Sequence, residues 1–261
     1  MMAQEVDQPY RLACLELRGG NQAGAYAAEL PGLAGWVSCR PLGTSGRGGD
    51  LYYLSSCSQG VIARVALADV AGHGEVVSSA AVRLRDALRE HVDHWDQSML
   101  IRRLNESVLK GPQSRFATAF VASFYCATGE LLFTNAGHQP PLWYRVATGE
   151  WSLLVDSTPY SKDIVDLPLG MIPGTSYSQT AVQLEVGDVL LLYTDGISES
   201  CDGSGEQLGL DGLLSLARGL PVESAPAAGR GLLAAVERFR GGVPAEDDVT
   251  VVALARRACP L

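Results

Sequence analysis

Residues 66–88 read ALADVAGHGEVVSSAAVRLRDAL. An apolar strand delivers Asp69, a glycine-rich turn follows, and a helix is predicted to begin near Gly74. Spacings of three or four residues place one apolar face on this helix: Val77, Ala81, Leu84, Leu88 and His91. The glycines of the turn let backbone atoms and ions approach closely. The segment therefore predicts a carboxylate at the tip of a strand, followed by an amphipathic helix.

Short strands are expected on both sides of this segment. The apolar run 51–70 is interrupted once, at Ser58-Gln59-Gly60, which predicts two antiparallel strands joined by a tight turn. Residues 97–109 predict a second helix. Residues 116–155 alternate apolar stretches with two Ala-Thr-Gly turn signals, which predicts a meander of four consecutively paired strands.

The rest of the chain continues the pattern of strands and helices. We expect, in chain order, an exposed loop at 156–166, strands at 176–184 and 188–194, helices at 206–218 and 223–240, and a last strand at 249–255. Hairpin-linked strands with interleaved pairs of helices favour antiparallel sheets covered by helices over a doubly wound parallel sheet. The sequence therefore predicts an α+β fold.

Composition limits the class of protein. The 261 residues are 47% hydrophobic and 19% charged, which suits one globular domain with a full core. The net charge of −9 disfavours nucleic acid and anionic membranes as partners, because both are bound through an excess of Lys and Arg. No apolar stretch reaches the roughly 20 residues of a membrane span. The start of the chain lacks the pattern of a secretory signal, so we expect a cytoplasmic protein.

The cysteines carry no sign of a metal site. Six of them are scattered along the chain without any C-x-x-C spacing. A chain of this length folds without covalent links between its elements. Free buried thiols are therefore expected, and a zinc site is not.

Aspartates recur at the tips of predicted strands, mostly beside glycine. They stand at four places: Gly49-Asp50 before LYYL, Asp69 after VALA, Asp195-Gly196 after LLLYT, and Asp247-Asp248 before VTVVALA. Oxygen ligands suit hard cations such as Mg²⁺ or Mn²⁺, and two such ions about 4 Å apart can clamp a phosphate and activate water. Taken singly, each Asp is more often a turn or cap residue. The four places together favour a two-metal site.

Six motifs stand along the chain in one order: GGDLYYL (48–54), ALADVAGHGEVVSSAA (66–81), TAFVASFY (118–125) with NAGHQPPLWYR (135–145), LPLGMI (167–172), LLLYTDGISES (190–200) and EDDVTVVAL (246–254). Together they resemble the PPM-type (class 2C) metal-dependent Ser/Thr protein phosphatases, in particular the bacterial branch of the sporulation stage II phosphatase and sigma-factor regulators. The resemblance covers about residues 30–256, and it implies that residues 1–261 form a single phosphatase domain. It implies a four-layer α-β-β-α sandwich of two mainly antiparallel sheets, with two Mn²⁺ or Mg²⁺ ions in a cleft at their edge.

The resemblance also implies roles for individual residues. Asp69 resembles the carboxylate that bridges both ions, the Val70 carbonyl is expected on one ion, and Asp50 is expected to bind directly or through water. In the implied mechanism a hydroxide that bridges the ions attacks phosphorus in line, because the ions lower the pKa of bound water and neutralise the phosphate. No phosphoenzyme intermediate is needed.

Asp195 and Asp247 are expected to complete the set of ligands around the second ion. Asp69 and Asp195 are the expected catalytic residues. Asp248 is a neighbouring candidate metal ligand. Because side chains alternate along a strand, Asp247 and Asp248 can hardly both face the ions. The register of the family motif favours Asp247, and the sequence alone leaves this choice open.

Four further residues near the motifs also bear on the predicted site. Arg47 is a candidate for binding the substrate phosphate, and a solvated loop charge is the alternative. Eukaryotic relatives place their candidate general acid where this chain has Ala71, so His73 is not expected in that role. His73 and His138 are instead expected to order a turn and a strand end. Tyr53 stands where relatives often carry a second acid, in a GGDxYD pattern.

The resemblance implies hydrolysis of phosphoserine or phosphothreonine in a partner protein, with a phosphorylated anti-sigma-factor antagonist as the candidate substrate. Two alternatives stay open: a catalytically weak or silent regulator that binds a phosphoprotein, and a two-metal phosphatase of a small phosphate ester. All four metal positions are present, which disfavours a silent protein. The Ala-rich helices leave open whether the chain forms a homodimer.

Overall fold

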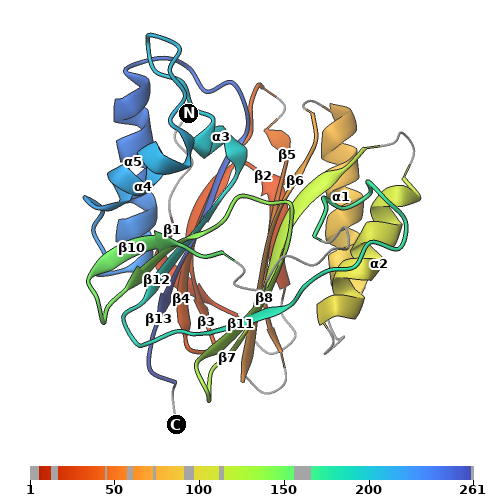
Figure 1. Ribbon diagram of the computed structural model, residues 1–261, viewed down its shortest axis with the longest axis horizontal. Helices are drawn as coiled ribbons and strands as arrows, with labels where there is room; N and C mark the ends of the chain where they lie inside the picture. The colour runs from red at the N-terminus through yellow and green to blue at the C-terminus, as the bar shows by residue number, and fades with distance from the viewer. Residues whose placement is uncertain are drawn as a thin grey trace.

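Two β-sheets pack face to face, and a pair of helices covers the outer face of each sheet (Figure 1). The computed structural model describes residues 6–12, 17–44, 46–57, 61–72, 75–90, 97–111, 115–155 and 166–259. The four layers run helix, sheet, sheet, helix, with an apolar cluster between each neighbouring pair of layers. The predicted α+β fold with an α-β-β-α sandwich is confirmed.

Seven strands of the described chain form the first sheet, in this spatial order: β1 (Val6–Arg11), β3 (Gly24–Leu30), β4 (Leu33–Arg40), β13 (Val249–Arg256), β12 (Val189–Tyr193), β9 (Leu142–Arg145) and β10 (Glu150–Leu153). Neighbouring strands are antiparallel except β1 and β3, which are parallel. All five residues of β12 are buried and apolar, because core lies on both faces of this strand.

Six strands of the described chain form the second sheet, in this spatial order: β11 (Thr180–Gln183), β8 (Glu130–Ala136), β7 (Ala117–Tyr125), β6 (Ile62–Val70), β5 (Arg47–Cys57) and β2 (Leu17–Gln22). Every neighbouring pair is antiparallel. The two antiparallel strands predicted over 51–70 are confirmed as β5 and β6. The second of them ends one residue after Asp69.

Five helices are described: α1 (Glu75–Glu90), α2 (Gln97–Leu109), α3 (Asp195–Ser198), α4 (Gly209–Ala217) and α5 (Ala225–Arg240). Four of them lie where helices were predicted, and the short α3 was not predicted. The predicted inner face of α1 is buried, apart from His91, which lies outside the described residues. The Ser224 hydroxyl caps α5 by accepting a hydrogen bond from the Ala227 amide at 3.2 Å. None of the helices described is both long and apolar enough to cross a bilayer.

The layers are held together by close packing of apolar side chains. Leu67 and Phe120 are buried in the cluster between the two sheets. Ile101 of α2 belongs to the cluster between the second sheet and its helices. On the other side, Gly229 of α5 packs directly on the Trp36 indole, where a Cβ atom would overlap the ring. Glycine is therefore required for the close approach of α5 to the first sheet.

The chain crosses from one sheet to the other where a meander was predicted. β7 and β8 pair in the second sheet, whereas β9 and β10 pair in the first. The prediction of four consecutively paired strands over 116–155 is therefore wrong at the β8–β9 connection. Alternation of apolar residues identifies strands but not their partners, because both sheets present an equally apolar face to the shared core. Of the loop predicted at 156–166, only Asp166 lies within the described residues.

A disulfide joins Cys126 to Cys259, with the two Cα atoms 5.7 Å apart. Cys126 follows β7 of the second sheet and Cys259 follows β13 of the first, so the bond links the two sheets. The prediction of free thiols is wrong for this pair and holds for the buried Cys39. A test for local C-x-x-C spacing could not detect two cysteines separated by 133 positions in the sequence.

The disulfide is expected to stabilise the fold by restricting the unfolded chain. Replacing Cys259→Ser should lower the free energy of unfolding by about 2–4 kcal/mol, because the bond closes a long loop in the unfolded state. Urea unfolding of the oxidised protein measures this change. Cys201→Ser, at a free cysteine, is the matched control and should leave stability nearly unchanged. Equal stability of the wild type and Cys259→Ser would contradict the prediction.

Candidate metal centre

The strand register brings Asp50 and Asp69 together. Asp50 lies directly opposite Asp69 across β5 and β6, and Asp69 lies opposite Thr118 of β7. Asp69 lies two residues after Leu67, whose side chain is in the core between the sheets, so alternation directs Asp69 to the same side. Asp50 is only 1% exposed. The two carboxylates therefore lie at one end of the inter-sheet core.

The first sheet contributes Asp195 to the same place. β12 ends at Tyr193, and Asp195 opens α3. The carboxyl groups of Asp195 and Asp69 lie close enough to interact with each other. Burial and the charges of Asp195 and Asp247 raise the pKa of Asp69 to about 8. Burial, and then the charge of Asp247, also raises the pKa of Asp195. The acids thus converge from both sheets.

Thr194 connects the two sheets through its hydroxyl group. Its Oγ1 donates to Asp50 Oδ2 at 2.7 Å and accepts from the Thr250 amide at 3.0 Å. Burial and the charge of Asp69 raise the pKa of Asp50 well above its usual range, and the hydrogen bond from Thr194 opposes this shift. Thr194 was not singled out from the sequence. The only local signal was its position directly before Asp195-Gly196.

Asp247 and Asp248 have different surroundings. Asp248 is 4% exposed, and its carboxylate accepts from the Leu42 amide at 2.6 Å and the Gly49 amide at 2.6 Å. Asp247 is exposed, and its charge acts on Asp69 and Asp195. The Asp248 carboxylate therefore holds the turn before β5, while the exposed Asp247 carboxylate accepts from the Asp248 amide at 2.7 Å through Oδ1 and can offer Oδ2 to a cation. This difference supports the choice of Asp247 over Asp248 as the metal ligand.

The glycines of the motifs allow this close packing. A Cβ atom on Gly48 would overlap the Asp248 carboxylate, and one on Gly196 would overlap the Asp248 carbonyl oxygen. A Cβ on Gly49 would lie 2.9 Å from the Val70 carbonyl oxygen. Any larger residue at these positions would force the four strand ends apart. The glycines beside the aspartates are therefore explained by close packing.

Arg47 and Tyr53 have different surroundings. Arg47 is the exposed first residue of β5, and the pairing of β5 with β2 is irregular between Arg47 and Tyr52. Tyr53 is buried in the cluster with α1 and α2, on the face opposite Asp50. The structure therefore separates Tyr53 from the acids, and the role of Arg47 in binding phosphate stays a prediction. His73 lies outside the described residues.

His138 lies behind the carboxylates, beside Thr118. Its Nδ1 is 2.8 Å from Thr118 Oγ1, and Thr118 pairs with Asp69. Asn135 fixes the backbone of His138, because its side chain accepts from the His138 amide at 2.7 Å and donates to its carbonyl at 2.9 Å. Burial lowers the pKa of His138 to about 4. The expected structural role of His138 at a strand end agrees with this neutral, buried ring.

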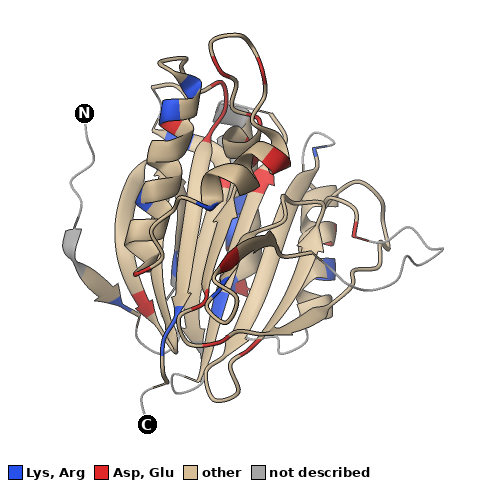
Figure 2. Cartoon of the chain, turned by 60° about the vertical axis from the view of Figure 1, so that its left-hand side comes forward, with Lys and Arg blue, Asp and Glu red and all other residues tan. Residues whose placement is uncertain are grey.

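The set of donors suits a hard divalent cation. Asp50, Asp69, Asp195 and Asp247 offer carboxylate oxygens, and none of them forms an ion pair with a Lys, Arg or His in the described part of the chain. Burial, and then repulsion from neighbouring acids, raises the pKa values of Asp50, Asp69 and Asp195, and a bound cation would offset both effects. Within the same described ranges, no three acidic, His or Cys side chains are drawn together tightly enough to enclose an ion. Figure 2 shows acidic positions at the upper ends of strands and in the loops above them, and others midway along and at the lower end of the molecule.

Comparison with known proteins identifies the family. The profile of the stage II sporulation protein E (SpoIIE) family matches residues 62–257, and the chain belongs to this family of PP2C-like phosphatases. The resemblance seen in the six motifs is thereby confirmed. The matched range includes β6, both layers of helices and β13.

Individual relatives agree with this assignment. Phosphoserine phosphatase RsbU of Bacillus subtilis (strain 168) is 28% identical over 155 residues, which are 58% of this chain and 43% of RsbU. The chain thus matches less than half the length of that relative. The structure of the RsbU and RsbW domains from Mycobacterium tuberculosis superposes with a TM-score of 0.71 at 23% identity, covering 93% of this chain and 64% of that one. The structure of RsbX in complex with magnesium superposes with a TM-score of 0.65 at 15% sequence identity, covering 90% of this chain and 100% of that one.

The two adjacent aspartates are predicted to affect stability in different ways. Asp248→Asn should lower the free energy of unfolding by about 1–3 kcal/mol, because the amide cannot accept from both Leu42 and Gly49. Asp247→Asn should leave it unchanged or raise it, because removing an exposed acid reduces repulsion. Urea unfolding in the presence of a chelator measures both. A larger loss for Asp247→Asn than for Asp248→Asn would reverse these assignments.

The buried imidazole of His138 predicts a pH dependence of stability. The unfolded chain binds a proton near pH 6.5, whereas the folded ring stays neutral down to about pH 4. Its contribution to stability is therefore complete above pH 6.5 and is lost as the pH falls toward 4, by up to about 3 kcal/mol. Unfolding of the metal-free protein should weaken less over this range in His138→Gln than in the wild type. Identical slopes in both proteins would refute the prediction.

Proposed function

We propose that this chain is a metal-dependent phosphatase that hydrolyses phosphoserine or phosphothreonine in a protein substrate. The observation that carries the proposal is the convergence of Asp69, Asp195 and Asp247 from two sheets, with the pKa of Asp69 raised to about 8. Such a perturbed cluster of acids without a cationic partner marks a functional site rather than a structural one. The phosphoserine phosphatase activity named for RsbU supports the same reaction.

Two divalent ions, Mn²⁺ or Mg²⁺, are the proposed cofactors. When bound, they supply Lewis-acid activation of water and neutralise the charge of the phosphate. Asp69 and Asp195 lie at the centre of the cluster and would contact both the ions and the reacting groups. Asp50 and Asp247 would complete the oxygen ligands, with the Val70 carbonyl beside Asp69. The magnesium in the RsbX structure supports this choice of cation.

The surrounding residues keep the acids in place. Thr194 orients the Asp50 carboxylate through its hydroxyl hydrogen bond of 2.7 Å. Asp248 fixes the turn that leads into β5 through the Leu42 and Gly49 amides. His138 remains neutral and adds no positive charge beside the cation site. The part proposed for these residues is to hold the ligands on two separate sheets at a constant distance.

The proposed substrate is a phosphorylated anti-sigma-factor antagonist, by analogy with the sigma-factor regulators of this family. An acidic protein needs bound cations to attract a phosphorylated partner, which agrees with the net charge of −9. A cytoplasmic location stays a prediction, and the disulfide between Cys126 and Cys259 is unusual for a reducing compartment.

Activity on a phosphoserine peptide and on p-nitrophenyl phosphate tests the proposal. Hydrolysis of the peptide should require Mn²⁺, stop with a chelator, and fall roughly 100-fold or more in Asp69→Asn, because the shared ligand of both ions is lost. Asp86→Asn, an exposed acid of α1 paired with Arg85, is the matched control and should retain activity.

Three other outcomes would contradict the proposal in different ways. Hydrolysis that continues without metal would exclude the two-ion site. Cleavage of only the small ester would indicate a phosphatase of small molecules. Tight binding of the phosphopeptide without cleavage would indicate a silent regulator.

A further inference from the structure

The turn that follows Asp69 is held from one side by Arg115. Arg115 Nη1 donates to the Ala71 carbonyl oxygen at 2.8 Å. The Ala71 amide donates in turn to the Phe116 carbonyl at 3.0 Å. Both polar groups of Ala71 are therefore fixed by two consecutive residues just before β7. The turn between Asp69 and α1 is thus tied to the neighbouring strand.

These two hydrogen bonds determine where the Val70 carbonyl points. A trans peptide is planar, so the Val70 oxygen points opposite to the Ala71 N–H. Because that N–H faces Phe116, directly before β7, the Val70 oxygen faces away from β7, toward Gly49 of β5. A Cβ on Gly49 would indeed lie 2.9 Å from this oxygen. The orientation keeps the Val70 carbonyl on the side of Asp50.

Gly72 shows how closely the guanidinium packs against the turn. Its φ of 105° lies in a region that other residues rarely adopt. A Cβ atom at this position would lie 2.6 Å from Arg115 Nη1. The guanidinium therefore occupies the space beside Gly72, and the turn cannot move toward it.

The base of Arg115 is itself anchored. Ala117 and Leu169 exchange two backbone hydrogen bonds, of 2.9 and 2.7 Å. The Asn105 side chain of α2 accepts from the Gly170 amide at 2.7 Å. A Cβ on Gly170 would lie 2.8 Å from the Arg115 carbonyl oxygen. Arg115 thus extends from a rigid support toward the turn.

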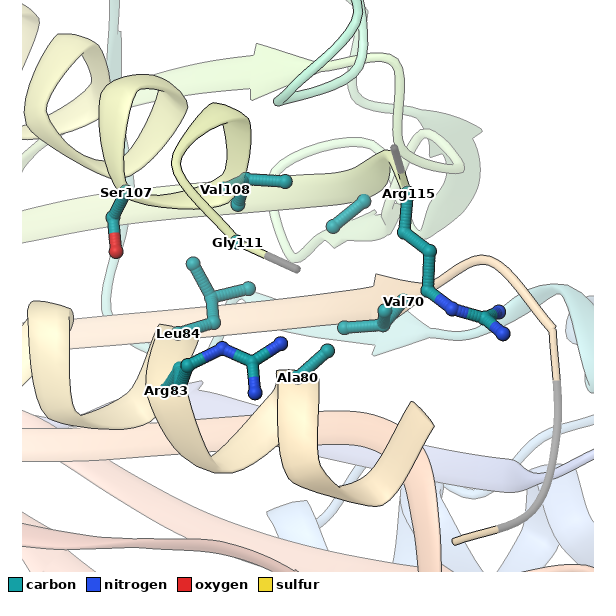
Figure 3. Close-up of a pocket in the computed structure, with 9 residues that line it drawn as sticks. Val70, Ala80, Arg83, Leu84, Ser107, Val108, Gly111 and Arg115 are labelled. Atoms are coloured by element: carbon teal, nitrogen blue, oxygen red, sulfur yellow. The ribbon is translucent and has the colours of Figure 1, made fainter. Parts of the chain in front are cut away.

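A second arginine lies across a small hollow of about 20 Å³, which holds one water molecule at most. The lining of the hollow includes Val70 of β6, Arg83 of α1 and Arg115. Figure 3 shows the Arg83 guanidinium directed into the hollow, while the Arg115 guanidinium is directed toward the turn after Val70. Arg83 is exposed and forms no hydrogen bond or ion pair with the described residues. It carries the same charge nearby without touching the turn.

We propose that Arg115 is a positioning residue that holds the turn 69–72 so that the Asp69 carboxylate and the Val70 carbonyl present their oxygens to a divalent cation. The inference rests on the proposed function, because it concerns the same cation site. A positioning role predicts a change in cation affinity opposite to the change expected from charge alone. Removing a positive charge near a cation site would tighten cation binding, whereas losing a positioning contact would weaken it.

Titration calorimetry with Mn²⁺ alone, without substrate, distinguishes the two effects. Arg115→Ala should bind Mn²⁺ about tenfold or more weakly than the wild type, as is typical when a residue that orients metal ligands is lost. Arg83→Ala is the matched control and should bind within about twofold of the wild type. Arg115→Lys keeps the charge but not the planar fork, and should also weaken binding. Circular dichroism establishes that each variant is folded, and Arg115→Lys carries the test if Arg115→Ala does not fold.

The outcomes separate this inference from the function on which it rests. Equal or tighter Mn²⁺ binding by folded Arg115 variants would overturn the positioning role and leave the phosphatase proposal intact. Equal weakening in Arg83→Ala and Arg115→Ala would also overturn it, because a general loss of charge would then explain both. Failure of the wild type to bind Mn²⁺ would overturn the proposed function and this inference together.

Discussion

The backbone holds several carboxylates close together, and their mutual repulsion is the main constraint on this structure. The register of β5 and β6 places Asp50 opposite Asp69, and β12 delivers Asp195 to the same point. Burial and mutual charge raise the pKa of Asp69 to about 8, so the metal-free site retains protons near neutral pH. A bound divalent cation would replace these protons and convert an unfavourable cluster into a favourable one.

The site exists only while the two sheets are packed together. One sheet supplies Asp50 and Asp69, and the other supplies Asp195 and Asp247. The apolar core between the sheets keeps the strand ends together, and Thr194 links them by hydrogen bonding to Asp50 and to the first sheet. Stability of the inter-sheet core and function of the site are therefore coupled, although the core residues touch no ligand.

Much of this arrangement could be predicted from the sequence, because strand tips and glycines are local signals. The strand ending near Asp69 and the helix after it both followed from the local pattern of apolar residues and glycines, whereas the choice between Asp247 and Asp248 stays a prediction. The long-range features could not be predicted. Nothing local distinguishes strands of one sheet from those of the other, nor shows that Cys126 meets Cys259. The roles of Thr194 and Asp248 depend on partners more than 50 positions away.

Anomalous diffraction at the manganese edge, from crystals grown with Mn²⁺, would locate the cations relative to the two sheets. We expect two peaks next to Asp69, with Asp195 and Asp247 among the ligands and Asp248 still bound to the Leu42 and Gly49 amides. Peaks coordinated by Asp248, or no peak at the meeting point of the two sheets, would contradict it.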